Sequence, residues 1–489
     1  MCAQLSVDDR RSRGAEAAAQ VPLQAHRGWA TAPGRRSPVG VLADQEDDRL
    51  SDLVPVRHGR MMVSPFTFYR GAAAVMAEDL GSTPVAGLPV QLCGDAHLSN
   101  FGVFGSPERR LVFDLNDFDE TLPGPFEYDV KRMVTSFVIA ARDNGFPAAD
   151  GKAVARDACA AYRTAMAEFA GLGTMDVWYA SLDEDRIKTV VQGAIANITK
   201  AQKSAKTAKE KKLARKEAKQ AKKAAKTAAK AGEKAHTRDS LQALSKLGEQ
   251  VGGQYRIVSQ PPVVVPLREL AFDMAPDVSP ERIEAAIRDQ FAAYRATLQP
   301  DLRHLLEQFE MVDAARKVVG VGSVGTRAYI VLLQGRDASD PLFLQVKEAT
   351  SSVLETQLPR SRYRQHGQRV VQGQRLMQAA SDIYLGWTRG PRGRDFYWRQ
   401  LRDMKGSAAI EAMTPLSLGA YARLCGWTLA RAHARSGDPV AIAAYLGTGD
   451  AFDRAMTDFA VRYADQNERD YTEFTAAVKA GELAAVEGV

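Results

Sequence analysis

The sequence has no long apolar run and few cysteines. Its 489 residues include four cysteines, Cys2, Cys93, Cys159 and Cys425, which are widely scattered without the paired spacing of a metal site and suit a reducing cytosol. No stretch approaches the roughly 20 consecutive apolar residues that span a bilayer. The first residues also lack the apolar core of a secretory signal. These absences predict a cytoplasmic protein without a membrane span.

A strong overall charge is also lacking, except in one segment. The net charge is +6, and much of it comes from residues 199–237, where lysine recurs at nearly every third position among alanines. Alanine and lysine favour a helix, and lysine on all faces leaves no packing face, so we expect a solvated helical insertion. The alternative is weak contact with an anionic surface or nucleic acid. The segment has no aromatic residue for base stacking, which favours the first interpretation.

The domain organisation follows from composition and periodicity. Residues 1–48 show no sustained hydrophobic period and are predicted to be a disordered arm. We expect a large catalytic lobe over residues 49–310, a small mixed lobe with the glycine-rich, nucleotide-binding motif over 311–404, and a helical continuation of the large lobe over 405–489. Helices are expected after Asp129, over 149–171 and over 418–436. The predicted fold class is α+β, in two lobes.

One stretch, from Cys93 to Asp129, concentrates groups suited to chemistry. It contains CGDAHLSNFG, then a β-type run and NDFDE, so that Asp95 precedes Asn100 by five residues and Asp117 follows after a hairpin. A carboxylate, an amide and a second carboxylate are what a Mg-nucleotide phosphotransferase needs. One carboxylate deprotonates the accepting hydroxyl, while the amide and the other carboxylate hold the metal on the phosphates.

A second motif lies about two hundred residues later. Gly320, Gly322 and Gly325 form G-x-G-x-x-G, and a strand-like run rather than a helix follows them. A dinucleotide-binding fold requires a helix at this point, whereas strand, glycine loop and strand form the phosphate-covering loop of kinases. Lys347 then ends a β-type run, where a kinase places its phosphate-pairing lysine. Its acidic partner is expected to be Glu355, with Glu348 as the alternative.

These motifs resemble those of a known enzyme family. GDAHLSN resembles the Gly-Asp-x-His-x-x-Asn catalytic loop of aminoglycoside-phosphotransferase-type kinases, and NDFDE resembles their metal-binding Asp-Phe-Asp turn. Asp129 matches their helix-opening aspartate, which anchors the backbone of the catalytic loop. The chain also resembles the bacterial domain-of-unknown-function family 2252 through FTFYRG, GDAHLSNFG, NDFDE, RDSLQALSKL and RQLRDMKGS. The resemblance implies a kinase-like fold and no known substrate.

The order of the motifs is rotated relative to ordinary kinases. Here the catalytic segment 94–129 precedes the glycine loop and lysine of 320–347. We therefore expect a circularly permuted kinase-like fold, which is physically permissible because termini at a surface can be relocated. This arrangement predicts that the end of the 418–436 helix lies against the strand before Cys93.

The resemblance implies an ATP- and Mg²⁺-dependent phosphotransferase that acts on an unknown hydroxyl acceptor, a small molecule or a protein. Asp95 is the expected base, and His97 braces its loop. The expected metal ligands are Asn100 and Asp117, with Asp119 or Asp114 as further groups. The expected nucleotide-binding residues are Gly320, Gly322, Ser323, Gly325, Lys347 and Glu355.

Three alternatives remain open at this point. A metal-dependent hydrolase could use a dinuclear centre built from Asp95, His97, Asp114, Asp117 and Asp119. A catalytically silent nucleotide-binding scaffold is another, and transfer of AMP instead of phosphate is a third. His433, in the 418–436 helix, is expected to be structural.

Overall fold

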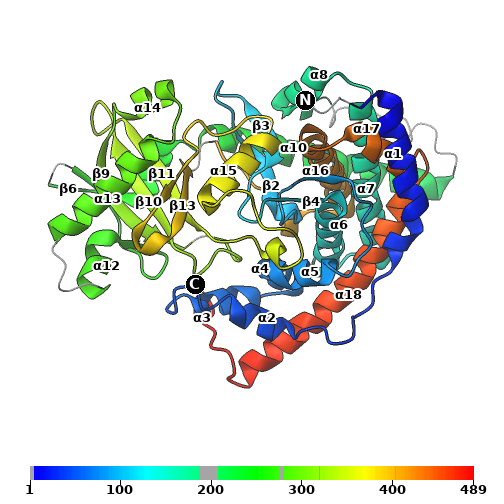
Figure 1. The fold of residues 1–489 in the computed structure, drawn as a ribbon, viewed down its shortest axis with the longest axis horizontal. Coiled ribbons are helices and arrows are strands. Elements are labelled where there is room, and N and C mark those ends of the chain that lie inside the picture. The colour runs from blue at the N-terminus through cyan, green and yellow to red at the C-terminus, as the bar shows by residue number, and fades with distance from the viewer. Residues whose placement is uncertain are drawn as a thin grey trace.

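The computed structural model describes residues 5–187, 189, 207–252, 254–274, 280–318, 320–401 and 404–488. Helices dominate one side of the molecule, and an antiparallel sheet with its covering helices forms the other side (Figure 1). The predicted mixed α+β class is confirmed. No helix in the described ranges combines the length and apolar character that a bilayer crossing requires.

The main sheet has six antiparallel strands in the order β12-β13-β11-β10-β9-β8. The strands are β8 (Val264–Pro266), β9 (Glu310–Lys317), β10 (Ala328–Gln334), β11 (Pro341–Ala349), β12 (Gly386–Arg389) and β13 (Asp395–Gln400). Alternate residues of β11 and β13 point to opposite faces, so Lys347 and its cross-strand neighbour Tyr397 share the face turned toward the helical part.

The segment from Ser240 to Leu306 belongs to the sheet, which corrects the expected lobe boundary near residue 310. Tyr294 stacks on Trp398 of β13 with ring centroids 4.5 Å apart, and Leu244 packs against Phe343 on the other face. Hydrophobic burial of these residues against the two faces of the sheet sets the boundary. The elements are α11 (Ser240–Leu247), β6 (Gly248–Val251), β7 (Gln254–Ile257), α12 (Leu267–Met274), α13 (Pro280–Arg295) and α14 (Pro300–Leu306).

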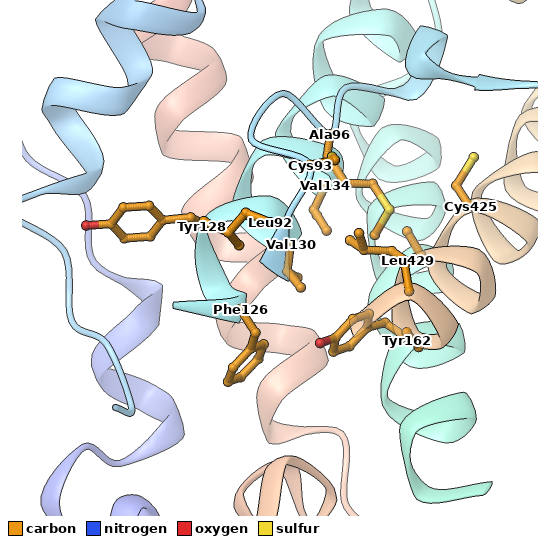
Figure 2. Close-up of a cluster of buried hydrophobic side chains, with 14 of the residues drawn as sticks. Leu92, Cys93, Ala96, Phe126, Tyr128, Val130, Val134, Tyr162, Cys425 and Leu429 are labelled. Atoms are coloured by element: carbon orange, nitrogen blue, oxygen red, sulfur yellow. The ribbon is translucent and has the colours of Figure 1, made fainter. Parts of the chain in front are cut away.

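The helical part is built around a pair of closely packed helices. It comprises α6 (Phe126–Asp143), α7 (Ala148–Ala170), α8 (Thr174–Tyr179), α16 (Pro415–Ser436), α17 (Pro439–Leu446) and α18 (Ala451–Lys479). A Cβ atom on Gly426 of α16 would stand 2.3 Å from the Ala158 carbonyl oxygen of α7, so glycine permits this close approach. Figure 2 shows Val130 and Val134 of α6 in the core with Leu429 of α16.

The N-terminal arm is ordered, so the prediction of disorder is wrong. It forms α1 (Val7–Gln20), η1 (Leu23–Arg27) and α2 (Pro38–Asp44), followed by α3 (Val54–Met61), α4 (Pro65–Gly71) and α5 (Ala73–Leu80). Gly14 of α1 lies so close to α17 that a Cβ would stand 2.2 Å from the Ala441 carbonyl oxygen. Arg35 joins Asp79 and Asp470 through hydrogen bonds of 2.7–2.9 Å. The arm packs through small residues and tertiary ion pairs instead of large apolar side chains. The sequence of the arm therefore shows no hydrophobic period.

Several further elements complete the described part of the fold. They are β1 (Pro89–Leu92), η2 (Leu98–Asn100), β2 (Phe101–Gly105), β3 (Leu111–Leu115), β4 (Leu122–Pro125), β5 (Leu182–Asp183), η3 (Val353–Thr356), α15 (His366–Met377), η4 (Pro391–Gly393) and η5 (Ile410–Ala412). The end of α16 lies against β1, where the Gln91 amide donates to Ser436 Oγ at 3.1 Å. The expected position of this helix end is therefore confirmed.

The lysine-rich segment is helical over α10 (Ala208–His236), as predicted, while residues 199–206 lie outside the described part. Lys219, Lys223, Lys226 and Lys230 are exposed. Near the end of α10, Ala235 is buried against Leu111 and Met404. The helix is thus attached to the body at its C-terminal end, and a stripe of lysine faces solvent.

Glu127 of α6 makes fold stability dependent on pH. It is fully buried, its Oε1 accepts the Ala86 amide at 2.7 Å, and burial raises its pKa from 4.5 to about 7. The folded state therefore holds this proton more tightly, and the unfolding free energy falls as pH rises from about 4.5 to 7. Urea unfolding measures this effect. Between pH 5 and 7.5, the unfolding free energy of the wild type should fall by on the order of 3 kcal/mol more than that of Glu127→Gln.

Glu127→Gln is the proper reference because Lys131 and His26, two other titratable groups beside Glu127, are present in both proteins. Burial lowers the pKa of Lys131 to about 8 and that of His26 to about 3. The histidine makes a stability contribution of opposite sign, present in both proteins. An identical pH slope in the wild type and Glu127→Gln would contradict the prediction.

Candidate functional site

The loop from Cys93 to Asn100 is held by the aspartate that opens α6. Asp129 accepts the backbone amides of Cys93 at 2.8 Å and Gly94 at 3.0 Å, and its Oδ2 lies 3.2 Å from His433 Nε2. Gly94 has a φ of +86°, where a Cβ would also stand 2.2 Å from the Glu120 carbonyl oxygen. The expected anchoring role of Asp129 and the structural role of His433 are confirmed.

The amide of Asn100 is oriented by the same loop. Asn100 Nδ2 donates to the Asp95 carbonyl oxygen at 2.8 Å, and Asn100 lines a cleft between the sheet and the helical part. The bond uses the amide nitrogen and leaves the side-chain oxygen available as a ligand. The carboxylate of Asp95 accepts Arg132 Nε at 2.7 Å, and 19% of the Asp95 side chain is exposed. Buried His97 accepts the Ser99 amide at 3.2 Å, which braces the loop as expected.

Lys347 reaches across the cleft from the sheet to the turn after β3. Its Nζ lies 2.5 Å from Asp119 Oδ2, and the Tyr397 hydroxyl donates to Asp119 Oδ1 at 2.6 Å. The Asp119 amide in turn donates to Asp117 Oδ1 at 3.3 Å. Asp117 and Lys347 line the same cleft. The structure thus brings together two motifs that lie about two hundred residues apart in the chain.

The two carboxylates of this turn are electrostatically distinct. Burial and the neighbouring Asp119 carboxylate raise the pKa of Asp117. Burial acts in the same sense on Asp119, but Lys347 and the hydrogen bonds from Lys347 and Tyr397 hold the pKa of Asp119 below its ordinary value. Burial opposes the charge of Lys347, yet Asp117 and Asp119 raise its pKa. Lys347 and Arg399 both act to lower the pKa of the two carboxylates, so two cations compensate the charge of this turn.

The glycine loop lies between two strands, as predicted, and arginines from the N-terminal segment hold its carbonyl groups. Arg60 donates to the Gly320 oxygen at 2.5 Å, and Arg49 donates to the Gly322 oxygen at 3.0 Å. Gly320 and Ser323 line the cleft. Gly325 instead lies against Arg49, whose Cβ is 3.1 Å from where a Cβ of Gly325 would be. Of the predicted loop residues, Gly320 and Ser323 face the cleft, while Gly322 and Gly325 contact other parts of the chain.

Two predictions about acidic groups are wrong. Lys347 pairs with Asp119 and not with Glu355, while Glu348 pairs with Arg327 and Arg394. Successive strand residues point to opposite faces, so Glu348 cannot share the face of Lys347.

Asp114 is not placed to bind a metal. It is fully buried, it pairs with Arg431, and its Oδ2 accepts the Ala379 amide at 2.8 Å. Asp114 lies within β3, whose residues are all buried, whereas Asp117 follows the strand and lines the cleft.

The cleft has a volume of about 640 Å³ and is strongly cationic. Its charged lining comprises eight cations and two carboxylates: Arg70, Arg109, Arg238, Lys246, Lys317, Lys347, Arg399 and Lys405, with Asp117 and Asp382. Such an excess of positive charge raises the local concentration of anionic ligands. The cleft therefore suits a phosphate-bearing molecule.

Sequence reasoning missed several residues of the site. Arg399 donates to the Asn116 carbonyl at 3.1 Å, and Arg369 of α15 donates to the Asp119 carbonyl at 2.8 Å. Tyr397 could have been found, since alternation places it and Arg399 on one face of β13. Arg132 and Arg369 carry no local signal, because their roles arise from helix packing.

A dinuclear metal centre finds no support in the geometry. Asp95 pairs with Arg132 and Asp114 pairs with Arg431, so two of its five expected ligands are engaged by arginine. Within the described ranges, no group of three or more His, Cys, Asp or Glu side chains is arranged to hold a metal ion. Of the remaining groups, Asp117 and Asn100 line the cleft, and Asp119 is held by Lys347 and Tyr397.

The fold and site define an α+β protein with a polar, cationic cleft between a sheet and a helical part. Residues 49–477 match a family model described as an uncharacterized protein conserved in bacteria, DUF2252. The chain therefore belongs to this family, as its motifs indicated. No curated protein and no solved structure matches the chain.

Proposed function

We propose that this protein is an ATP- and Mg²⁺-dependent phosphotransferase of kinase-like type. The observation that carries the proposal is the contact between Lys347 and Asp119 across the cleft, with Asp117 and Asn100 lining it. A phosphotransferase needs a cation for the nucleotide phosphates and oxygen ligands for a metal at one place. These groups come from opposite sides of one cleft.

The donor set fits Mg²⁺. Asp117, Asp119 and the side-chain oxygen of Asn100 are carboxylate and amide oxygens, the ligands that this hard cation prefers. The side-chain nitrogen of Asn100 donates to the Asp95 carbonyl oxygen, so the side-chain oxygen of Asn100 remains for the metal. When bound, Mg²⁺ neutralises charge on the phosphates.

The protein groups have separate roles in this proposal. Lys347, whose pKa is raised, stays charged and binds phosphate oxygens, and Gly320 and Ser323 line the same cleft. Asp95 accepts the proton of the acceptor hydroxyl. Arg132 fixes the orientation of that carboxylate through its 2.7 Å bond.

The permuted kinase-like topology is part of the proposal. Two structural features support it: Asp129 anchors the loop that carries Asp95, and the end of α16 lies against β1. The first matches the role of the helix-opening aspartate in kinases. The second is the junction that a rotated chain order requires.

Binding of Mg-ATP should raise the melting temperature of the purified protein. A ligand that binds only the folded state stabilises it by mass action, by about 2.7 kcal/mol at one hundred times its dissociation constant. A thermal-shift comparison of ATP, GTP and adenosine, each with and without Mg²⁺, measures this effect. Stabilisation that requires both triphosphate and Mg²⁺ supports the proposal. Stabilisation by Mn²⁺ or Zn²⁺ alone, with indifference to nucleotides, would favour a hydrolase and overturn it.

A further inference from the structure

Arg70 is a cation of the cleft lining that the roles assigned above leave unused. It lies in the last turn of α4, and it lines the same cleft as Asn100, Gly320 and Ser323. Its guanidinium carbon lies 6.0 Å from the centroid of the Phe66 ring. In the part of the chain that the structure describes, the Arg70 side chain forms no hydrogen bond or ion pair, and its Nε atom is buried without a partner. The guanidinium is therefore available to a ligand in the cleft.

Two cations on the opposite side of the cleft are already engaged. Lys347 pairs with Asp119, and Arg399 donates to the Gln345 side chain at 2.9 Å and to the Asn116 carbonyl at 3.1 Å. In a kinase, the lysine at the position proposed for Lys347 pairs with the α- and β-phosphates of the nucleotide. The terminal phosphate then requires a further cation.

The last turn of α4 adjoins the two elements that a terminal phosphate must reach. The Arg70 carbonyl oxygen stands 3.1 Å from where a Cβ of Gly322 would be, so its backbone lies against the glycine loop. The carbonyl of Tyr69 accepts Arg132 Nη2 at 2.7 Å, and Arg132 Nε in turn donates to the Asp95 carboxylate at 2.7 Å. This turn thus joins the glycine loop to the side chain that holds the proposed base.

The charges of Arg70 and Asp95 act on each other. Burial lowers the pKa of Arg70, and the Asp95 carboxylate acts in the opposite sense. Burial, Arg70 and Arg132 together hold the pKa of His97 well below its ordinary value, so the histidine adds no positive charge. The hydrogen-bonded partner of Asp95 is Arg132, which leaves the Arg70 guanidinium unbound within electrostatic reach of the base. The transferred phosphate must stand next to that base.

We propose that Arg70 binds the terminal phosphate of the nucleotide and makes the cleft selective for a nucleoside triphosphate over a diphosphate, an inference that rests on the proposed function. A guanidinium presents paired N–H groups that match the oxygens of a phosphate. An arginine that neutralises charge on the transferred group is a recurring part of phosphate-transferring enzymes. An Arg70 that only supported the glycine loop would affect the binding of both nucleotides equally.

The variant Arg70→Met of the full chain tests the proposal by calorimetry. The probes are Mg-ADP and the Mg²⁺ complex of the non-hydrolysable β,γ-imido analogue of ATP. The dissociation constant of the analogue should rise by about tenfold or more, as expected for a lost hydrogen bond to a charged group, whereas that of Mg-ADP should change by less than about twofold. Arg70→Lys keeps the charge without the paired N–H groups and should recover part of the loss. Arg13→Met is the matched control, because Arg13 is an exposed arginine of α1 outside the cleft lining.

Unchanged affinities, or an equal loss of affinity for both nucleotides, would overturn the role of Arg70 and leave the proposed function standing. If the wild type binds neither nucleotide, the proposed function fails and the role of Arg70 fails with it. Melting temperatures of the ligand-free variants show whether the fold is retained. If Arg70→Met does not fold, Arg70→Lys takes its place, and a loss of affinity confined to the triphosphate analogue carries the same meaning.

Discussion

Asp117→Asn is expected to abolish Mg-dependent nucleotide binding, whereas Asp95→Asn should leave that binding intact and lower turnover by about 10²- to 10⁴-fold. The reason is position: Asp117 lines the cleft together with Lys347, while the Asp95 carboxylate is held by Arg132. Loss of Asp117 removes a metal ligand. Loss of Asp95 removes the proton acceptor, while asparagine retains an oxygen that can accept from Arg132.

Calorimetry with Mg-ATP and a phosphate-transfer or ATP-hydrolysis assay measure the two effects separately. Asp157→Asn is a suitable control, since Asp157 forms a surface ion pair with Arg423. Melting temperatures of all three variants show whether the fold is retained. Equal loss of nucleotide binding in the Asp95 and Asp117 variants would contradict the roles assigned here.

Arg431→Met should lower the unfolding free energy by about 3–5 kcal/mol, because it leaves the Asp114 carboxylate buried without its cation. Arg431 and Asp114 are almost completely buried, and the guanidinium also donates to the Met377 carbonyl. Burial raises the pKa of Asp114 even in the presence of Arg431. The loss should therefore be larger at pH 8 than at pH 5, where the unpaired carboxyl group can be protonated.

Urea unfolding of the single variants and of Arg431→Met/Asp114→Asn measures this coupling. The double variant should recover part of the lost stability, since the uncompensated charge is gone. If the two single losses simply add, the ion pair contributes nothing beyond its separate parts and the prediction fails.

Local sequence patterns were sufficient for the elements that carry the candidate site. The α16 and α6 helices, the strand before Cys93 and the strand that follows the glycine loop were all expected from periodicity and turn residues. Asp129 was assigned as an anchor through the resemblance to aminoglycoside-phosphotransferase-type kinases, and a carboxylate in the first turn also suits the helix dipole. These features depend on a few neighbouring residues, so they are readable without tertiary contacts.

The N-terminal arm and the lobe boundary were mispredicted for a common reason. Gly14 and Ala17 of α1 are small, so they produce almost no hydrophobic period, yet their small size allows close contact with α17. Leu244 and Tyr294 look like ordinary helix residues until the sheet they cover is known. In both cases the missing information was the identity of the packing partner.

By itself, the sequence determined the mixed α+β composition, the family, the helical lysine-rich segment and the residue types available for phosphate and metal chemistry. Only the tertiary structure decided that Lys347 pairs with Asp119 and not with Glu355. It also decided that Asp114 forms an ion pair with Arg431 and that arginines bind the carbonyl groups of the glycine loop. The physical reason is that these pairings join residues far apart in the chain. Their distances are set by how the sheet and the helices pack, and no local pattern records that packing.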